Sequence, residues 1–221
     1  MPAADRQRQL LEVALGAFSR RGFKGTTTKE IAMAAGVAEA IIFQHFPSKE
    51  ALYSTLLERH LDSGEEQRWD ARITECMDRN DDASFFRLFI ERIFQDHRRD
   101  PLLERVILFA ALEGHEQGLA RLHEMVFSRV ERILAYIARR QAEGAFIKCS
   151  PHMILLALNA MARQYIMLTG IIRAPVPEMD EEELVQLFTR ILQQGIRETA
   201  PKDTESSDRK PESESKRKAK E

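Results

Sequence analysis

The chain has 221 residues, of which 43% are hydrophobic and 31% are charged, and its formal net charge is −2. This composition fits a soluble globular protein of one large domain or two small ones, and it excludes a chain built mainly of membrane spans. Residues 1–60 carry 8 Lys and Arg against 6 Asp and Glu, whereas residues 61–199 carry 18 against 23. The N-terminal part therefore has the positive balance expected of a phosphate-binding module.

The first predicted helix covers residues 5–21 and is amphipathic. Its apolar stripe recurs at the spacing of one helical face and consists of Leu10, Leu11, Ala14, Leu15 and Phe18. Gly22 ends this helix. Thr27 is placed to cap the next helix, and Glu30 three residues later completes a capping box.

A tight turn separates the second helix from a short third helix at about residues 38–45. Gly36 suits the turn, because glycine readily adopts the positive φ that such a turn requires. Ile42 and Phe46 point back at the second helix. Two short helices joined by a glycine-containing turn are typical of a helix-turn-helix, whose second helix enters the DNA major groove.

The similarity goes beyond a generic helix-turn-helix. The residues that carry it are Ala17, Phe18, Gly22, Phe23, Thr26, Thr27, Ile31, Ala32, Ala35, Gly36, Val37, Ile42, Phe43, His45, Phe46, Ser48, Lys49, Glu50 and Leu52. In residue type and spacing, this stretch resembles the N-terminal domain of the tetracycline-repressor (TetR) family of bacterial transcription regulators. The resemblance covers the first quarter of the chain. Beyond it, the chain agrees with the family in being helical and of suitable length.

The resemblance implies DNA contacts on the outward face of the third helix and at the starts of the second and fourth helices. These positions are Thr26, Thr27, Thr28, Lys29, Glu39, Ala40, Ile41, Phe43, Gln44, His45 and Lys49. Helix N-termini and lysines suit phosphates, Gln44 suits adenine, Glu39 suits cytosine N4, and Ile41 suits a thymine methyl group. Simpler roles stay open, since Glu39 also fits a first-turn acid and Ile41 also fits packing against a neighbouring helix.

Two positions depart from the family pattern. Phe43 stands where the family usually has Tyr, so a phosphate-binding hydroxyl is missing. Ala38 stands where Ser is frequent, so one cap or backbone contact is lost. Each lost hydrogen bond is worth about 0.5–1.5 kcal/mol. The fold and the mode of DNA binding should survive both changes.

The remaining chain predicts an all-α protein of about nine helices. The later helices are expected at about residues 49–64, 83–97, 101–112, 116–142, 151–172 and 180–198. Residues 65–82 are polar and stay unassigned. The predicted division is a three-helix DNA-binding domain at 1–47, a helical regulatory and dimerisation domain at 48–198, and a disordered tail at 199–221.

The longest apolar run, Met153 to Ile172, is interrupted by Asn159, Arg163 and other polar residues. Because such groups are costly inside a bilayer, a buried helix is favoured over a membrane span. Cys76 and Cys149 lack Cys-x-x-Cys spacing, which favours unpaired thiols in a reducing cytoplasm over a disulfide. The expected localisation is therefore cytoplasmic, without a membrane partner.

The last two predicted helices indicate a homodimer. The helix at 151–172 is apolar around most of its circumference. The helix at 180–198 has a wide apolar face made of Leu184, Val185, Leu187, Phe188, Ile191, Leu192 and Ile196. Two such helices would leave a large exposed patch on a monomer, and pairing with a second chain would cover it. A twofold dimer predicts a palindromic double-stranded operator, with half-sites about 10 base pairs apart or at a larger spacing.

In the family, the C-terminal helices also bind a small molecule. The candidate lining is Phe86, Phe89, Phe109, Met125, Met161 and Tyr165, with Asn159 and Arg163 as polar anchors. Phe94 and Phe127 are further candidates. These residues suggest an apolar or amphipathic effector, although aromatic residues at helical spacing are more often core. No cofactor, metal set or nucleophile motif is evident, and His115 and His123 read as surface residues.

The sequence therefore predicts a DNA-binding transcription regulator, specifically a repressor that an apolar or amphipathic ligand releases from its operator. In this hypothesis, the helix at 49–64 carries the motion from the body to the DNA-binding part. One alternative is a DNA-bound adaptor that recruits a protein without a small-molecule ligand. A catalytic helical domain is a third reading, and it would need a convergent polar cluster in a cleft.

Overall fold

The structure is a computed structural model that describes residues 3–61 and 64–197. Within these two ranges no strand forms, and one isolated antiparallel bridge joins Phe146 to Arg197. The all-α prediction is therefore confirmed. In chain order the elements are α1 (Ala3–Arg21), α2 (Thr28–Ala34), α3 (Glu39–His45), α4 (Lys49–Leu61), α5 (Gly64–Asp78), α6 (Asp82–Arg99), α7 (Leu103–Glu113), α8 (Glu116–Ala142), α9 (Pro151–Ile166), the π-helical η1 (Met167–Ile172) and α10 (Glu181–Ile196).

Helix α5 is the element that the sequence analysis left unassigned. Most of its residues are charged or polar, so its apolar face is difficult to recognise in the sequence. Trp69, Ile73 and Met77 recur every four residues and lie buried against the rest of the body. This spacing places them on one face, and that face packs against α6. The helix count therefore exceeds the predicted nine in the part of the chain that the structure describes.

The buried residues form two separate clusters. The head core joins α1, α2, α3 and α4 to α7 and includes Phe18, Ile31, Ile42 and Phe46. It also takes in Val106 of α7. The body core is built by α5, α6, α8, α9 and α10. Helices α4 and α7 thus pack with the head, so the predicted division after residue 47 does not coincide with the division between the cores. The predicted tail at 199–221 lies outside the described residues.

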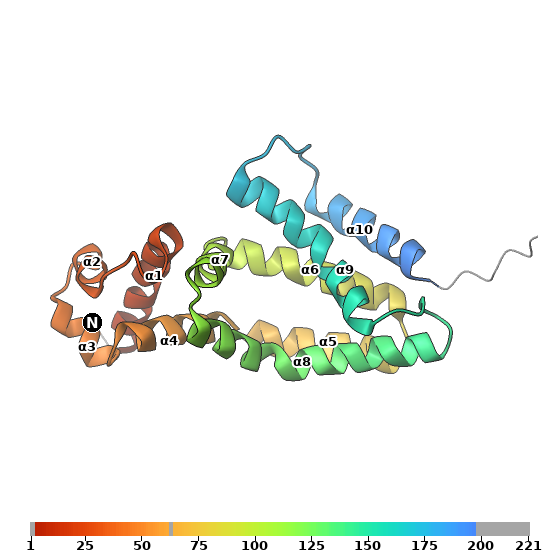
Figure 1. Cartoon of the computed structure of the whole chain (residues 1–221), viewed down its shortest axis with the longest axis horizontal. Coiled ribbons are helices and arrows are strands. Elements are labelled where there is room, and N and C mark those ends of the chain that lie inside the picture. The colour runs from red at the N-terminus through yellow and green to blue at the C-terminus, as the bar shows by residue number, and fades with distance from the viewer. Residues whose placement is uncertain (1–2, 62–63, 198–221) are drawn as a thin grey trace, which may run out of the picture.

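Figure 1 shows the head at one end of an elongated molecule, with α5, α6 and α8 running along the body. Helix α9 crosses this layer obliquely, and α10 packs against α6 and α9. The head meets the body through α7, which contacts α1, and through α8, which contacts α4. The body therefore has two helices through which it can influence the head.

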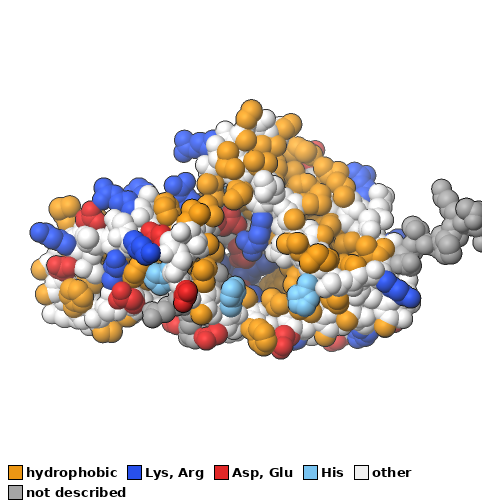
Figure 2. Space-filling view, in the orientation of Figure 1, with side chains coloured by type: hydrophobic (Ala, Val, Ile, Leu, Met, Phe, Trp, Pro, Cys, Tyr) orange, Lys and Arg blue, Asp and Glu red, His pale blue; other side chains and the backbone are white. Residues whose placement is uncertain are grey.

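One side of α9 remains uncovered on the single chain. Ile154, Leu158, Ala162 and Ile166 are buried at four-residue spacing, whereas Leu156 on the other side is 59% exposed. By length and apolar composition alone, Pro151–Ile172 is the one helix among the described residues long enough to cross a membrane, and 22% of its most apolar window is buried. The expectation of a buried helix is therefore met on one side only. Figure 2 shows hydrophobic side chains gathered over the region of α9 and α10.

Candidate DNA-binding interface

The start of α2 is fixed by the capping box that the sequence predicts. The backbone N–H of Glu30 donates to the Thr27 hydroxyl at 3.2 Å, and the Glu30 carboxylate accepts from the Thr27 backbone N–H at 3.0 Å. This backbone hydrogen bond from Thr27 is the main cause that lowers the pKa of Glu30. Two otherwise unpaired N–H groups of the helix start are thereby satisfied. Thr27 and Lys29 at this helix start are exposed, and helix starts are sites where phosphates bind.

The turn between α2 and α3 depends on glycine. Gly36 has a φ of +68°, and no atom lies within 4 Å of where its Cβ would stand. The requirement is therefore the backbone conformation rather than space. The N–H of Val37 donates to the carbonyl of Ala32 at 3.0 Å, which closes the end of α2. Buried Ile42 and Phe46 then hold α3 against the head core.

The outward face of α3 is exposed, as the sequence predicts. Ala40, Phe43 and Gln44 are exposed, and Ile41 and His45 are half-buried. Phe43 keeps 48% of its surface accessible, which is unusual for an aromatic side chain without a partner. This face has the size and position of a recognition helix.

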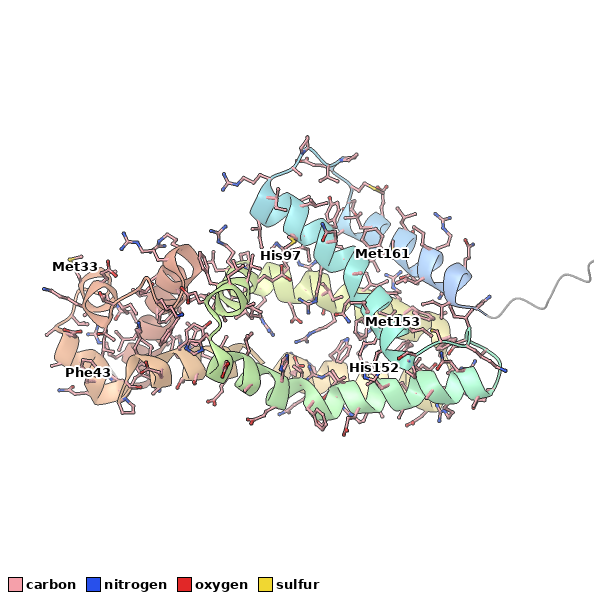
Figure 3. All side chains as sticks on the ribbon, in the orientation of Figure 1. Met33, Phe43, His97, His152, Met153 and Met161 are labelled. Carbon is pink, nitrogen blue, oxygen red and sulfur yellow. The ribbon has the colours of Figure 1, made fainter. Side chains whose placement is uncertain are left out.

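Met33 extends the same exposed end of the molecule. Its side chain is 76% exposed although it is apolar, and Figure 3 shows Met33 on α2 and Phe43 on α3 at the same end of the molecule. The sequence analysis did not select Met33 as a site residue. A helical projection of α2 would have found it, because Ile31 and Ala32 take the inner positions and leave Met33 outside.

Glu39 is held by a neighbouring helix. Its carboxylate accepts a hydrogen bond of 2.5 Å from the Thr28 hydroxyl at the start of α2. This contact ties the starts of α2 and α3 together and orients the carboxylate. One Thr28 oxygen and one Glu39 oxygen are therefore committed to each other, which limits both residues as direct contacts to DNA.

Two of the predicted DNA contacts have structural roles instead. The Thr26 side chain is 1% exposed, and its hydroxyl donates to the Gly22 carbonyl at 2.8 Å. The Lys49 ammonium donates to the carbonyls of Phe23 and Thr26 at 2.9 and 3.0 Å and lies 4.1 Å from the centre of the Phe23 ring. Because both polar groups are already engaged inside the head, the structure does not place them on the exposed face. Thr27, Thr28 and Lys29 remain at the accessible start of α2.

Helix α7 forms hydrogen bonds with the segment that precedes α2. The Glu113 carboxylate accepts from the backbone N–H groups of Phe23 at 2.9 Å and Lys24 at 3.2 Å. The Lys24 ammonium donates back to the Glu113 carbonyl at 2.8 Å. Arg105 also donates to the Ser19 carbonyl at 3.0 Å. These contacts join both ends of α7 directly to the DNA-binding head.

The predicted effector residues are not brought together. Phe86 and Phe89 are buried in the body core, and Phe86 packs against Phe146 with ring centres 5.6 Å apart. Tyr165 turns toward α6 and α10, where it meets Phe94 and Phe188 at 6.3 and 6.4 Å. Residue type alone did not separate core aromatics from cavity-lining ones. Phe86, Phe89 and Tyr165 are thus packing residues.

The other predicted effector residues point to different places. Met161 packs partly buried against the body core, and Phe109 lies half-buried on α7 near Gly22. Asn159 and Arg163 line an open apolar groove of about 510 Å³ between α7 and α9. The side chain of Met125 lies outside the described residues. Only the two predicted polar anchors therefore share one groove.

Neither candidate histidine forms a metal site in the described part of the chain. His115 caps α8, and its Nδ1 accepts from the Gly118 N–H at 2.9 Å. The His115 ring also packs against Phe23 with ring centres 4.3 Å apart, whereas His123 is exposed. No group of three or more His, Cys, Asp or Glu side chains that could hold a metal occurs in residues 3–61 and 64–197. Cys76 and Cys149 are free thiols.

Comparison with known proteins identifies this architecture. The sequence profile "Bacterial regulatory proteins, tetR family" matches residues 10–56. Nucleoid occlusion factor SlmA of Citrobacter koseri is 31% identical over 146 residues, which cover 63% of this chain and 71% of SlmA. The chain belongs to the TetR family. Its helix-turn-helix is accordingly that of a DNA-binding transcription regulator.

Two further TetR-family comparisons extend over most of the chain. The HTH-type transcriptional regulator RutR of Escherichia coli O157:H7 is 25% identical over 197 residues, which cover 87% of this chain and 91% of RutR. The fatty acid degradation regulator FadR from Bacillus halodurans has a TM-score of 0.64 at 18% identity, covering 88% of this chain and 97% of FadR. The body of this TetR-family protein therefore shares the regulators' fold as well as their head.

Proposed function

We propose that this protein is a homodimeric repressor that binds a palindromic operator through α3. The observation that carries the proposal is the exposed face of α3, held out by buried Ile42 and Phe46. Gln44 reads a base edge in this proposal, Phe43 and Ile41 contact apolar base atoms, and the start of α2 binds phosphates. Ala40, His45 and Lys29 complete the contact surface. The cytoplasm, where bacterial DNA lies, is the proposed location.

The second chain is proposed to cover the uncovered face of α9, η1 and α10. On the single chain Leu156, Ile172 and Ile191 are 59%, 57% and 46% exposed. Met153 adds a further exposed apolar side chain at the start of α9. A soluble monomer rarely exposes so continuous an apolar surface. Twofold pairing of these helices buries it and presents two copies of α3 to successive major grooves.

A small-molecule effector is proposed to act through α7. The groove between α7 and α9 is lined by Ile107, Leu108 and Met167, with Asn159 and Arg163 at its polar side. Leu156 of the proposed interface also lines this groove, so in the dimer the second chain would form one of its walls. An apolar or amphipathic ligand there would separate α7 from α9. Because Glu113 ties the end of α7 to the N–H groups before α2, a shift of α7 would move the head. Operator binding must then weaken effector binding by the same factor.

A DNA-bound adaptor is the second candidate. It is favoured by the similarity to a nucleoid occlusion factor and by grooves that open to solvent. An adaptor would bind a protein partner without losing DNA affinity. Operator affinity measured with and without candidate small molecules therefore separates the two candidates.

The direct test compares two exposed glutamines. Gln44→Ala removes the proposed base contact, and Gln67→Ala makes the same chemical change on the exposed surface of α5. Footprinting on the DNA upstream of the protein's own gene should show a palindrome. Its affinity should fall about 100-fold with Gln44→Ala, because each of the two chains loses a bidentate base contact worth about tenfold, and it should stay unchanged with Gln67→Ala. Equal affinities for both variants would reject α3 as the reading helix. Lys49→Ala is unsuitable here, because it would also remove the hydrogen bonds from Lys49 to two backbone carbonyls of the head.

A further inference from the structure

A second groove lies in the body, between α5 and α6. Its volume is about 600 Å³, which is within the usual range for small-molecule sites. The lining is Arg68, Trp69, Arg72, Arg92, Gln95, Arg98 and Arg99. Five of these seven residues are arginines, in a part of the chain whose overall balance is negative. So many guanidinium groups in one groove call for anionic partners.

Carboxylates of the protein neutralise only part of this charge. Arg92 pairs with Glu66 and Asp96, and Arg98 pairs with Glu181. Arg99 also contacts Asp96, at 3.3 Å. These three arginines are thereby held in place at the α6 side of the groove.

The α5 side of the groove is different. Arg68 and Arg72 are exposed and form no ion pair with any carboxylate in the described ranges. They are four residues apart on α5, so they stand one above the other on the same helical face. Their guanidinium groups therefore remain available to an anion from outside.

The floor of the groove is formed by two largely buried side chains, Arg92 and Trp69. The Arg92 side chain is 10% exposed and lies 5.9 Å from the Trp69 ring centre. Trp69 is 7% exposed and donates from its ring N–H to the Leu88 carbonyl at 3.1 Å. Arg129 lies near the same ring, at 5.5 Å. A fixed aromatic ring and a fixed cation thus lie beneath the two available arginines.

We propose that this groove is a binding site for a small polyanion that carries at least two phosphate or carboxylate groups. Arg68 and Arg72 bind one anionic group through their planar N–H forks. A second anionic group binds toward the end of α6, where it must displace Glu181 from Arg98 or Asp96 from Arg99. Gln95 supplies a neutral hydrogen-bond donor between them. This site is separate from the α7–α9 groove and from the DNA-reading face of α3.

Trp69 makes the proposal directly measurable, because it is the only tryptophan of the chain. Its fluorescence in the full-length protein would be followed during titration with pyrophosphate and, separately, with citrate at constant ionic strength. We expect a saturable change with one site per chain for at least one of these anions. An anion bound to the DNA-reading head would leave the emission of Trp69 unchanged, since Trp69 belongs to the body core.

Two double variants test whether the anion binds in this groove. Arg68→Ala with Arg72→Ala should weaken anion binding at least tenfold. Arg79→Ala with Arg190→Ala changes the net charge equally but leaves the groove intact, and it should stay within twofold of the unaltered protein. All four side chains are exposed, so both variants should keep the helical circular dichroism spectrum. Absence of a saturable response to both anions, or equal weakening by both double variants, would overturn the proposal.

Discussion

The head core and the body core differ in how completely one chain covers them. Phe18 and Ile42 are fully buried in the head, and among helices α1 to α4 the large apolar side chains that remain exposed, Met33 and Phe43, lie at its tip. The body leaves Leu156 and Ile191 exposed along α9 and α10. Helices α1 to α4 are thus complete within one chain except where DNA is proposed to bind, whereas Leu112 of α7 is also exposed. The body has a long apolar face that a second chain can complete.

The largest expected effect on stability comes from truncating a buried side chain of the head core. Phe46→Ala removes a ring that is 2% exposed, and it should lower the free energy of unfolding by about 3–5 kcal/mol. Leu156→Ala, on the exposed side of α9, should cost less than about 1 kcal/mol in the folding of the single chain. Urea unfolding measured at low protein concentration would check both values. Similar losses for the two variants would mean that the face of α9 is covered within one chain.

Charges on the body face should separate the chains without unfolding them. Leu156→Glu with Ile191→Glu places two carboxylates on the proposed interface, and sedimentation should then show a monomer with an unchanged helical spectrum. Operator affinity should fall at least ~100-fold, which is about 2.7 kcal/mol, because the two heads no longer bind together. A dimer that persists in this variant would disprove the proposed interface.

Alkaline pH should destabilise the head core, because the core contains the buried phenol of Tyr53. Burial, followed by the charge of Glu113, raises the pKa of Tyr53 to about 12. The folded head therefore holds the phenol neutral while the unfolded chain begins to ionise near pH 10, so stability is full below pH 10 and falls as the pH rises toward 12. The loss due to Tyr53 should be about 1.4 kcal/mol at pH 11. Tyr53→Phe should remove this part of the pH dependence between pH 9 and pH 11 in urea unfolding, and an unchanged slope would rule out Tyr53 as its source.

The contact between the head and α7 gives the smallest expected effect. Glu113→Ala removes the acceptor for the N–H groups of Phe23 and Lys24, which are partly solvated, so the loss of stability should be about 1 kcal/mol. The same variant should shift operator affinity and reduce its response to an effector, because α7 is no longer tied to the head. Glu116→Ala is the control, because it makes the same chemical change at the exposed start of α8 and does not line the effector groove. An effector response that survives Glu113→Ala unchanged would exclude this route of coupling.

Local signals in the sequence predicted the head well. The capping box of Thr27 and Glu30, the positive φ of Gly36 and the burial of Ile42 each depend on neighbours within a few residues. Side-chain roles that depend on distant contacts were not predictable in this way. Lys49 was assigned to phosphate because its sequence position gives no sign of the Phe23 carbonyl that it binds.

The body was harder to predict for a related reason. The apolar face of α5 is narrow, and its charged residues pair across helices, as Glu66 does with Arg92. Sequence alone shows neither that pairing nor the arginine groove, because Arg72 and Arg98 come to line one groove only in the folded chain. Phe86 and Phe89 were equally compatible with a cavity and with a core until their packing partners were known.

The stoichiometry of the complex with operator DNA tests the central claim most directly. Sedimentation of the protein with a duplex that carries the protected palindrome should give two chains per duplex. Footprinting on that duplex should show twofold-symmetric protection, with half-site centres about 10 base pairs apart or at a larger spacing. One chain per duplex, or protection of a single half-site, would contradict a regulator in which α9 and α10 pair two heads on DNA.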